Sequence, residues 1–413
     1  MKLKKMMTGV LCMALAATFV PAATDVYAAN NEKEGEPTKM TLILRGGSYA
    51  DVLKAALPKF EEENNCEIET LDLSFDDLHT GIALDATNKE GTYDLCMVDG
   101  SWMAEFTENN VLANLSEMGY TFDEDIIPNT TTICKKEDDI FLAPYFGNVT
   151  VLLYNKANVE EAGYKPEDIK TLEDLLEVAK AEKEAGKNGF AYRGDTPDNI
   201  VSDFLPILLA NGGWVVDENN QPTINTPEFI QAMEYYTELI STGSAMSKDD
   251  VSASIDNGSS ALAIGWPGWY VPSADSAADY MVSPTAVKEG AEAYNTSEYG
   301  TWCLGIPSNS PNPDLALKLL QYIMSPEVQM ESVENGGVPC RYSVLKNEEV
   351  LKDYPHLSTV CDALDQGVYR PAIAEWTEFT NILGAEMGNI MAGTKTVEQG
   401  LEDAQTQLES LMA

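Results

Sequence analysis

Histidine and arginine are both scarce in this chain of 413 residues. The only histidines are His79 and His356, which argues against a histidine-based nucleophilic mechanism and against a histidine-rich zinc site. The four arginines are Arg45, Arg193, Arg341 and Arg370. A dedicated clamp around a dianion would need several of them together. Motifs of the GxSxG, HExxH and GxxxxGK[ST] types are also missing, so three common enzyme classes have no support.

Long apolar runs are missing as well, and no stretch reaches the roughly 18 residues of a membrane-spanning helix. The first 28 residues instead read as a secretory signal peptide, with lysines at the start, an apolar centre and "VYA" before a cut near Ala28. A lipid anchor on Cys12 has weak support, because Leu11 replaces the small residue expected before it. Residues 29–38 form a charged, structureless leader. We therefore expect an exported protein, in the periplasm or at the cell surface.

No CxxC pair occurs among the cysteines. Of the seven cysteines, Cys12 leaves with the signal peptide, and six remain: Cys66, Cys96, Cys134, Cys303, Cys340 and Cys361. An even number in an exported chain favours disulfides, whereas wide spacing and apolar surroundings favour buried free thiols. The sequence leaves both possibilities open.

Basic residues are too few to balance the acidic ones, and the net charge is −41. Such a surface repels phosphates and anionic lipids, which argues against nucleic acid and anionic membrane surfaces as partners. The same charge keeps a protein soluble and monomeric, and we expect a monomer. No metal or cofactor is expected.

What the chain does contain is a strand–helix alternation. "MTLIL" (40–44) is a short strand, and Ser48 is a suitable N-cap for a helix whose apolar residues recur at helical spacing. A second strand ("CEIETLDLS"), a helix over 76–87 and a third strand ("YDLCMVDG", 93–100) follow. This order predicts βαβ units and a mostly parallel sheet, with ligands at the carboxyl ends of the strands.

The second half continues in the same style. Thr171 and Asp174 form a capping box, and Thr226 with Pro227 starts another helix. Three long extended segments interrupt the pattern, namely 140–156, 299–308 and 336–344, and each is able to pass from one sheet to another.

The order of these motifs resembles the extracellular solute-binding proteins of ABC importers, in the carbohydrate-binding group that includes maltose-binding protein (solute-binding family 1). The segments that carry the resemblance are "YDLCMVDGSWMAEFTENNVLANLSE", "APYFGNVTVLLYNK", "LANGGWVVDENNQPTINTPEFIQAMEYYTEL", "SPEVQMESVENGGVPCRYSV" and "MAGTKTVEQGLEDAQTQL". They extend over essentially the whole mature chain.

The resemblance implies an α/β fold of the type II periplasmic-binding-protein class, with two lobes joined by three crossings and a ligand in the cleft between them. The N-terminal lobe would comprise 39–146 plus 302–340, and the C-terminal lobe 147–301 plus 341–413. A ligand that touches both lobes would stabilise the closed form.

Polar residues at strand ends are the first candidates for ligand contacts. Gly47 allows a close backbone approach, and Ser48 opens a helix whose free N–H groups suit an oxygen-rich ligand. Asp76 and Asp77 follow the second strand. Asp99 ends the third strand as either an N-cap or a hydroxyl acceptor, and we expect Trp102 after it to be an exposed stacking ring at the cleft rim.

Aromatic residues from other segments complete the candidate site, because a flat ring suits the apolar face of a sugar while polar side chains suit its edges. The segment "IGWPGW" (264–269) ends a short strand at a carboxyl edge, so at least one of its two tryptophans should be a ligand platform. On the resemblance, the full set adds Tyr145, Phe146 and Asn148 on the first crossing, Trp302 on the second, Arg341 on the third, Trp266, Trp269, and Trp376 near an aromatic position of the family. Arg341 has an interlobe salt bridge as its alternative role, and Trp214 reads as a packing or surface residue.

The resulting hypothesis is a binding protein without enzymatic activity that delivers a sugar or oligosaccharide to ABC permease subunits. Two alternatives stay open. The first is the same fold binding a polyamine, which the acidic balance suits, or another small solute. The second is an exported carbohydrate-active enzyme, which the strand–helix count disfavours.

Overall fold

Two five-stranded sheets organise the chain in the computed structural model, which describes residues 36–269, 272, 276–286 and 295–413. The expected signal peptide, and the leader up to residue 35, lie outside the described residues. The strands are β1 (Thr38–Arg45), β2 (Cys66–Leu73), β3 (Leu95–Asp99), β4 (Lys135–Lys136), β5 (Asp139–Ile140), β6 (Ala143–Phe146), β7 (Val151–Asn155), β8 (Asn188–Tyr192), β9 (Ser244–Ala245), β10 (Ser260–Gly265), β11 (Ala278–Met281), β12 (Glu298–Tyr299), β13 (Trp302–Gly305) and β14 (Val368–Tyr369).

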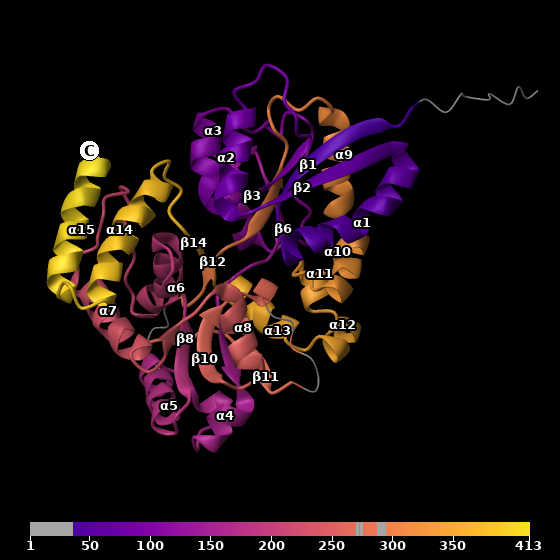
Figure 1. The fold of residues 1–413 in the computed structure, drawn as a ribbon. Coiled ribbons are helices and arrows are strands. Elements are labelled where there is room, and N and C mark those ends of the chain that lie inside the picture. Colours follow the sequence, from indigo (N-terminus) through magenta and orange to yellow (C-terminus); the bar gives the residue numbers. More distant parts are fainter. Residues whose placement is uncertain (1–35, 270–271, 273–275, 287–294) are drawn as a thin grey trace, which may run out of the picture. The chain divides into compact units, whose positions relative to one another are not determined.

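The helices connect and cover these strands (Figure 1). The α-helices are α1 (Ser48–Asn64), α2 (Phe75–Asp85), α3 (Met103–Glu108), α4 (Lys156–Glu161), α5 (Leu172–Glu184), α6 (Pro197–Ala210), α7 (Pro227–Ile240), α8 (Lys248–Asp256), α9 (Pro313–Ile323), α10 (Pro326–Ser332), α11 (Tyr342–Leu345), α12 (Glu348–Asp353), α13 (Leu357–Asp365), α14 (Trp376–Met391) and α15 (Val397–Leu411). Short 3₁₀ turns occur at η1 (Gly100–Trp102), η2 (Pro128–Cys134), η3 (Pro166–Asp168), η4 (Pro267–Trp269) and η5 (Val333–Asn335). Within the described residues, no helix combines the length and the hydrophobicity that a membrane span requires.

The first sheet has the strand order β2-β1-β3-β13-β6. β1 pairs in parallel with β2 and β3, as the βαβ prediction requires, whereas β13 returns from far along the chain and pairs antiparallel with β3 and β6. All five residues of β3 are buried, because helices cover both faces of a central parallel strand. We call this sheet and the helices packed on it the first lobe.

The start of α1 differs from its prediction. Gly47 is the residue before the helix, with φ of 89°, a left-handed value that favours glycine. Ser48 is therefore not the N-cap, and its hydroxyl instead donates to the carbonyl of Gly268 at 2.9 Å. The apolar face of α1 is buried as the helical spacing predicts, through Val52, Leu53 and other residues that pack against the sheet.

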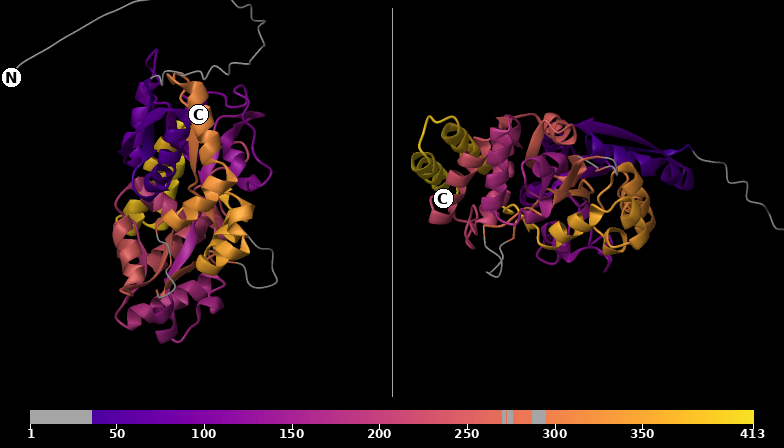
Figure 2. Two further views of the ribbon diagram at one scale, coloured as in Figure 1. Left: turned by 90° about the vertical axis from the view of Figure 1, so that its right-hand side faces the viewer. Right: turned by 90° about the horizontal axis from the view of Figure 1, so that it is seen from below.

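The second sheet has the order β11-β7-β10-β8-β9, and we call it with its helices the second lobe. The predicted capping box of Thr171 and Asp174 is confirmed at α5, and Thr226 caps α7 with Pro227 at its first position. α14 packs on α6 and also runs beside α15 (Figure 1, Figure 2). These helices bury a second apolar cluster that is distinct from the first.

Three extended segments run side by side where the chain passes between the lobes. The amide of Thr150 donates to the carbonyl of Glu298 at 2.8 Å, and the amide of Gly300 donates to the carbonyl of Asn148 at 3.0 Å. β12 then pairs in parallel with β14. The crossings are therefore a hydrogen-bonded hinge of residues 147–150, 298–301 and 366–370.

The third crossing lies later in the chain than the predicted segment 336–344. The reason is that α11, α12 and α13 stay with the first lobe, where α11 packs on α10 and α13 packs on η2. These contacts favour placing 341–365 with the first lobe, whereas the prediction assigned them to the C-terminal lobe.

The cysteines are free and buried among the described residues, which favours the thiol alternative. Cys134 and Cys303 come closest, with their Sγ atoms 3.8 Å apart. Burial raises the pKa of Cys96 to about 12, so its thiol is protonated and unreactive.

Candidate functional site

A cavity of about 540 Å³ lies between the two lobes and over the hinge. Its lining comes from strand ends of both sheets, from the start of α6 and α8, and from each crossing. This volume is in the range of small-molecule sites, and the lobes contribute from opposite sides. The prediction that polar residues meet at strand ends is thus realised in space by the pairing of the two sheets.

One wall of the cavity is aromatic and comes from the second lobe. Trp266 follows β10 and Trp269 ends η4, and their ring centroids lie 4.8 Å apart at an interplanar angle of 53°. Trp266 is 4% exposed, whereas Trp269 is half-buried, and both line the cavity. The Pro-Gly between them makes the tight turn that brings the two indoles together.

Arg193 is packed against this pair. Its guanidinium carbon is 4.8 Å from the ring centroid of each indole, so it makes a cation–π contact with both rings. Asp203 on α6 accepts from Nε of Arg193 at 2.9 Å, from a terminal guanidinium nitrogen, and from the Arg193 amide at 2.8 Å. The carboxylate therefore fixes the guanidinium plane, and the guanidinium in turn fixes the indoles.

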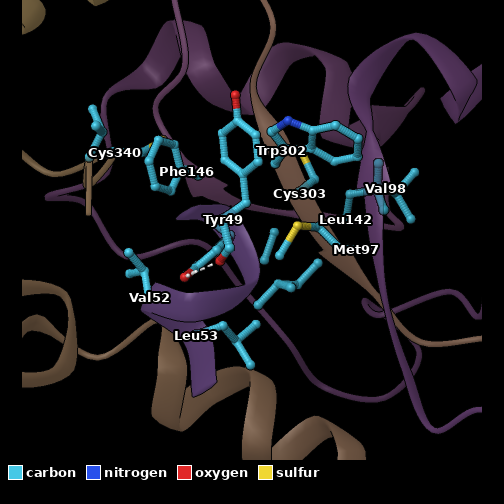
Figure 3. Close-up of a cluster of buried hydrophobic side chains, with 14 of the residues drawn as sticks. Tyr49, Val52, Leu53, Met97, Val98, Leu142, Phe146, Trp302, Cys303 and Cys340 are labelled. Atoms are coloured by element: carbon cyan, nitrogen blue, oxygen red, sulfur yellow. Dashed lines mark hydrogen bonds between the residues drawn. The ribbon is translucent and has the colours of Figure 1, made fainter. Parts of the chain in front are cut away.

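The facing wall belongs to the first lobe and contains Trp302 with Tyr49 and Phe75. Figure 3 shows the Tyr49 ring between Phe146 and Trp302, with its hydroxyl pointing away from Val52. Burial raises the pKa of Tyr49 to about 12, so its hydroxyl stays protonated and able to donate.

The floor of the cavity is made by the hinge itself. Asn148, Gly300 and Arg370 line it, one from each crossing. Arg370 donates through Nε to the buried Glu298 carboxylate and through a terminal nitrogen to the Ser202 hydroxyl at 3.0 Å. Asn148 Oδ1 is buried and has no hydrogen-bond partner within the described residues, while Nδ2 of the same side chain donates to the Tyr49 hydroxyl at 3.4 Å.

The charge of the lining is balanced, in contrast to the charge of the whole chain. The cavity has four basic side chains and four acidic ones, namely Arg45, Arg193, Lys248 and Arg370 with Asp76, Asp99, Asp195 and Asp198. The two signs are partly separated. Asp99 and Asp198 act electrostatically on the Arg370–Glu298 pair, whereas Arg45 and Arg193 act on Lys248.

Comparison with known proteins then places the chain. The family described as bacterial extracellular solute-binding protein matches residues 46–330. The chain belongs to this family. The resemblance stated from the sequence is confirmed, and the fold is confirmed by structures such as maltose-bound MalE3 of T. maritima, which is 24% identical with a TM-score of 0.79 over 91% of this chain and 100% of that one.

Two curated relatives of this solute-binding protein extend over most of its length. A probable amino-acid ABC transporter periplasmic-binding protein from Sinorhizobium fredii is 22% identical over 96% of this chain and 95% of the relative. An arabinooligosaccharide-binding protein from Bacillus subtilis is 21% identical over 84% of this chain and 83% of the relative.

Several residues predicted for the site of the solute-binding protein do line the cavity. They are Asp76, Asp99, Asn148, Trp266, Trp269 and Trp302. Asp99 also has the capping role that was its alternative, because its carboxylate accepts from the amide of Ser101 at 2.9 Å and from the hydroxyl of the same residue at 2.7 Å.

Other predicted residues lie behind the first-lobe wall. Trp102 is 2% exposed and not the rim platform we expected, because it packs against Phe75 at 4.9 Å and Trp302 at 5.8 Å between ring centroids. Tyr145 and Phe146 are buried in the same apolar cluster. These rings support Tyr49 and Trp302 without lining the cavity.

The remaining predicted residues also lie outside the lining. Asp77 accepts from the Ser74 hydroxyl at 2.7 Å at the start of α2. Gly47 makes the turn before α1, and the Ser48 hydroxyl donates to the carbonyl of Gly268. Arg341 is 2% exposed and pairs with Asp123 and Asp125 in the first lobe, so it is neither a ligand contact nor an interlobe bridge.

Trp376 is likewise absent from the cavity. It begins α14, is 4% exposed, and stacks on Phe379 at 5.4 Å between ring centroids, at an interplanar angle of 18°. The apolar cluster of the second lobe includes it, so its place is structural.

The cavity residues that the sequence did not single out include six charged ones: Arg45, Arg193, Asp195, Asp198, Lys248 and Arg370. The scarcity of arginine was the one signal in the sequence, because three of the four arginines in the chain line this cavity. Each is isolated in the sequence, and only the pairing of the lobes brings them together.

Proposed function

We propose that this protein captures a carbohydrate in the cavity between its lobes, outside the cytoplasm, and delivers it to the permease of an ABC importer. The observation that carries the proposal is the arrangement of the walls. Trp266 and Trp269 face the cavity from one lobe and Trp302 faces it from the other. Flat apolar rings suit the C–H faces of a sugar, and fixed polar groups at the floor suit its hydroxyls.

The floor supports the same reading. Asn148 offers both a donor and an unpartnered acceptor, and it sits on a crossing that connects the lobes. A ligand held there touches both lobes and the hinge at once, which favours the closed arrangement. The names of relatives that bind arabinooligosaccharides or maltose agree with this ligand class.

A polyamine is a weaker candidate than the net charge suggests. The lining carries as many basic as acidic side chains, so a polycation would meet Arg45, Arg193 and Lys248 as well as carboxylates. Amino acids are included as control ligands in the experiment below, because one relative is named as a probable amino-acid transporter binding protein.

The decisive experiment is a thermal-shift and calorimetry screen with sugars, sugar alcohols and oligosaccharides, together with spermidine and amino acids. A ligand at 100 times its Kd should add about 2.7 kcal/mol to the free energy of unfolding. Trp266→Ala and Trp269→Ala should each weaken sugar binding, whereas Trp214→Ala, outside the cavity, should not. Stabilisation by spermidine or an amino acid alone, with none by any sugar, would refute the proposal.

Two further parts of the proposal are open to direct tests. Export through the signal peptide predicts that protein from the cell exterior begins after Ala28, which N-terminal sequencing would establish. Binding without turnover predicts that oligosaccharides are recovered unchanged after incubation with the protein. The expected monomer predicts a single species of about the chain's own mass in sedimentation. Release of shorter sugars would favour the enzyme alternative.

A further inference from the structure

One end of the cavity combines cations that the structure does not neutralise. Arg45 ends β1 in the first lobe and is half-buried. One of its guanidinium nitrogens donates to the carbonyl of Leu73 at 3.2 Å and to that of Gly46 at 3.4 Å. Within the described residues no carboxylate forms an ion pair with Arg45. The other N–H groups of the fork are left for a ligand.

Lys248 faces the same end from the second lobe, at the start of α8. Its ion-pair partner is the neighbouring Asp249, at 3.8 Å and with a side chain 93% exposed, which neutralises little. Burial lowers the pKa of Lys248, and the positive charges of Arg45 and Arg193 lower it further. Two cations with weak partners are thus held close together by two different lobes.

The surroundings are those of an anion subsite on a sugar. Arg193, which is already paired with Asp203, adds a cation packed against both indoles, and the buried Tyr49 hydroxyl is a neutral donor that lies near Arg45 and Arg193. The carboxylates Asp76 and Asp195 also line the cavity, but both are exposed to water, which screens them. The indoles provide the ring platform directly beside this cluster.

We propose that the ligand is an acidic sugar, of the hexuronic acid class, whose carboxylate binds between Arg45 and Lys248 while its ring lies against Trp266 and Trp269. This inference rests on the proposed function and specifies its substrate class. A carboxylate matches the planar fork of an arginine, and a bound anion contacting one cation from each lobe draws the lobes together. A neutral sugar would leave Arg45 with backbone carbonyl partners only and Lys248 with the exposed Asp249 only.

The test compares acidic sugars with their neutral parents. Oligomers of glucuronate, galacturonate and mannuronate, the corresponding neutral oligosaccharides, and glucose 6-phosphate are titrated by calorimetry at low and high salt. We expect the matching uronate to bind at least about tenfold more tightly than its neutral parent, and to lose affinity as sodium chloride is added. Arg45→Gln and Lys248→Gln should each remove most of that preference, whereas Arg45→Lys should retain part of it.

Lys180→Gln is the matched control, because Lys180 is an exposed lysine that pairs with Glu238 on the outside of the second lobe. Circular dichroism verifies that each variant is folded, and binding of the neutral parent gives a second check on the site. Equal affinity for acid and neutral sugars, or tighter binding of the phosphate than of any uronate, overturns this inference and leaves the proposed function intact. If no sugar of either kind binds, both proposals fail.

Discussion

Removal of the Asp203 carboxylate is the perturbation that best tests how the aromatic wall is built. Asp203 is 2% exposed and Arg193 is 8% exposed, and the pair is joined by two side-chain bonds and one backbone bond. Asp203→Asn keeps the shape of the side chain but leaves a buried guanidinium without its counter-charge. The guanidinium carbon, which lies 4.8 Å from the ring centroids of Trp266 and Trp269, is then no longer held in place against the two rings.

The expected cost follows from this burial. Loss of one partner of a buried ion pair destabilises a protein by about 3–5 kcal/mol, whereas an exposed pair contributes about 0–1 kcal/mol. For domains the size of these lobes, 1 kcal/mol corresponds to roughly 2–4 °C in melting temperature. The variant should therefore melt at least about 6 °C lower and bind its sugar more weakly, because the indoles are no longer fixed.

The assay is differential scanning calorimetry without ligand, followed by titration with the sugar found in the screen. Asp362→Asn is the matched control, because Asp362 is an exposed carboxylate on α13 and its loss removes the same formal charge. The reasoning would be refuted if the two variants melted at the same temperature, or if Asp203→Asn bound sugar as tightly as the unmodified protein.

Three further predictions concern other parts of the chain. Burial lowers the pKa of His356 from 6.5 to about 4, so the folded protein favours the neutral ring. The free energy of unfolding should therefore fall by about 3 kcal/mol as the pH drops from 6.5 to 4. Denaturation curves at pH 7 and pH 4 should show that His356→Gln lacks this pH-dependent loss. The buried thiols, Cys96 included, should resist iodoacetamide at pH 8 in the folded protein and all react once it is unfolded, as counted by mass spectrometry; modification of the folded protein would contradict this. Gly268→Ala should weaken ligand binding about tenfold, because its new Cβ would lie 2.8 Å from Cε1 of Tyr49. Gly388→Ala is the control in the same titration, because its new Cβ would lie at an ordinary 3.6 Å from Cδ1 of Ile200.

Much of the fold follows from local signals. Apolar spacing along α1, the capping box at Thr171 and Asp174, and the proline after Thr226 each act within a few residues, so the sequence is enough to place them. The third crossing was misplaced because "GGVPCRYSV" is extended locally, and only the packing of α11 and α13 on the first lobe shows that the chain has not yet crossed.

The tryptophans illustrate the limit for the site. Trp102, Trp302 and Trp376 have similar local surroundings at the start of a helix or strand, yet only Trp302 lines the cavity. All three are 2–4% exposed, and which of them borders the cavity depends on what packs around it from elsewhere in the chain. For Trp102 the covering groups are Phe75 and Trp302, and for Trp376 they belong to the core of the second lobe.

The sequence by itself determined the alternation of strands and helices, the family resemblance and the "IGWPGW" turn with its two indoles. Tertiary structure alone decided the electrostatics of the cavity. Arg45, Arg193 and Lys248 are far apart in the chain and carry no shared motif, and a net charge of −41 gives no hint of them. They meet because parallel strands end at one edge of each sheet and the hinge holds the two edges face to face, so a balanced, partly basic cavity forms within an acidic protein.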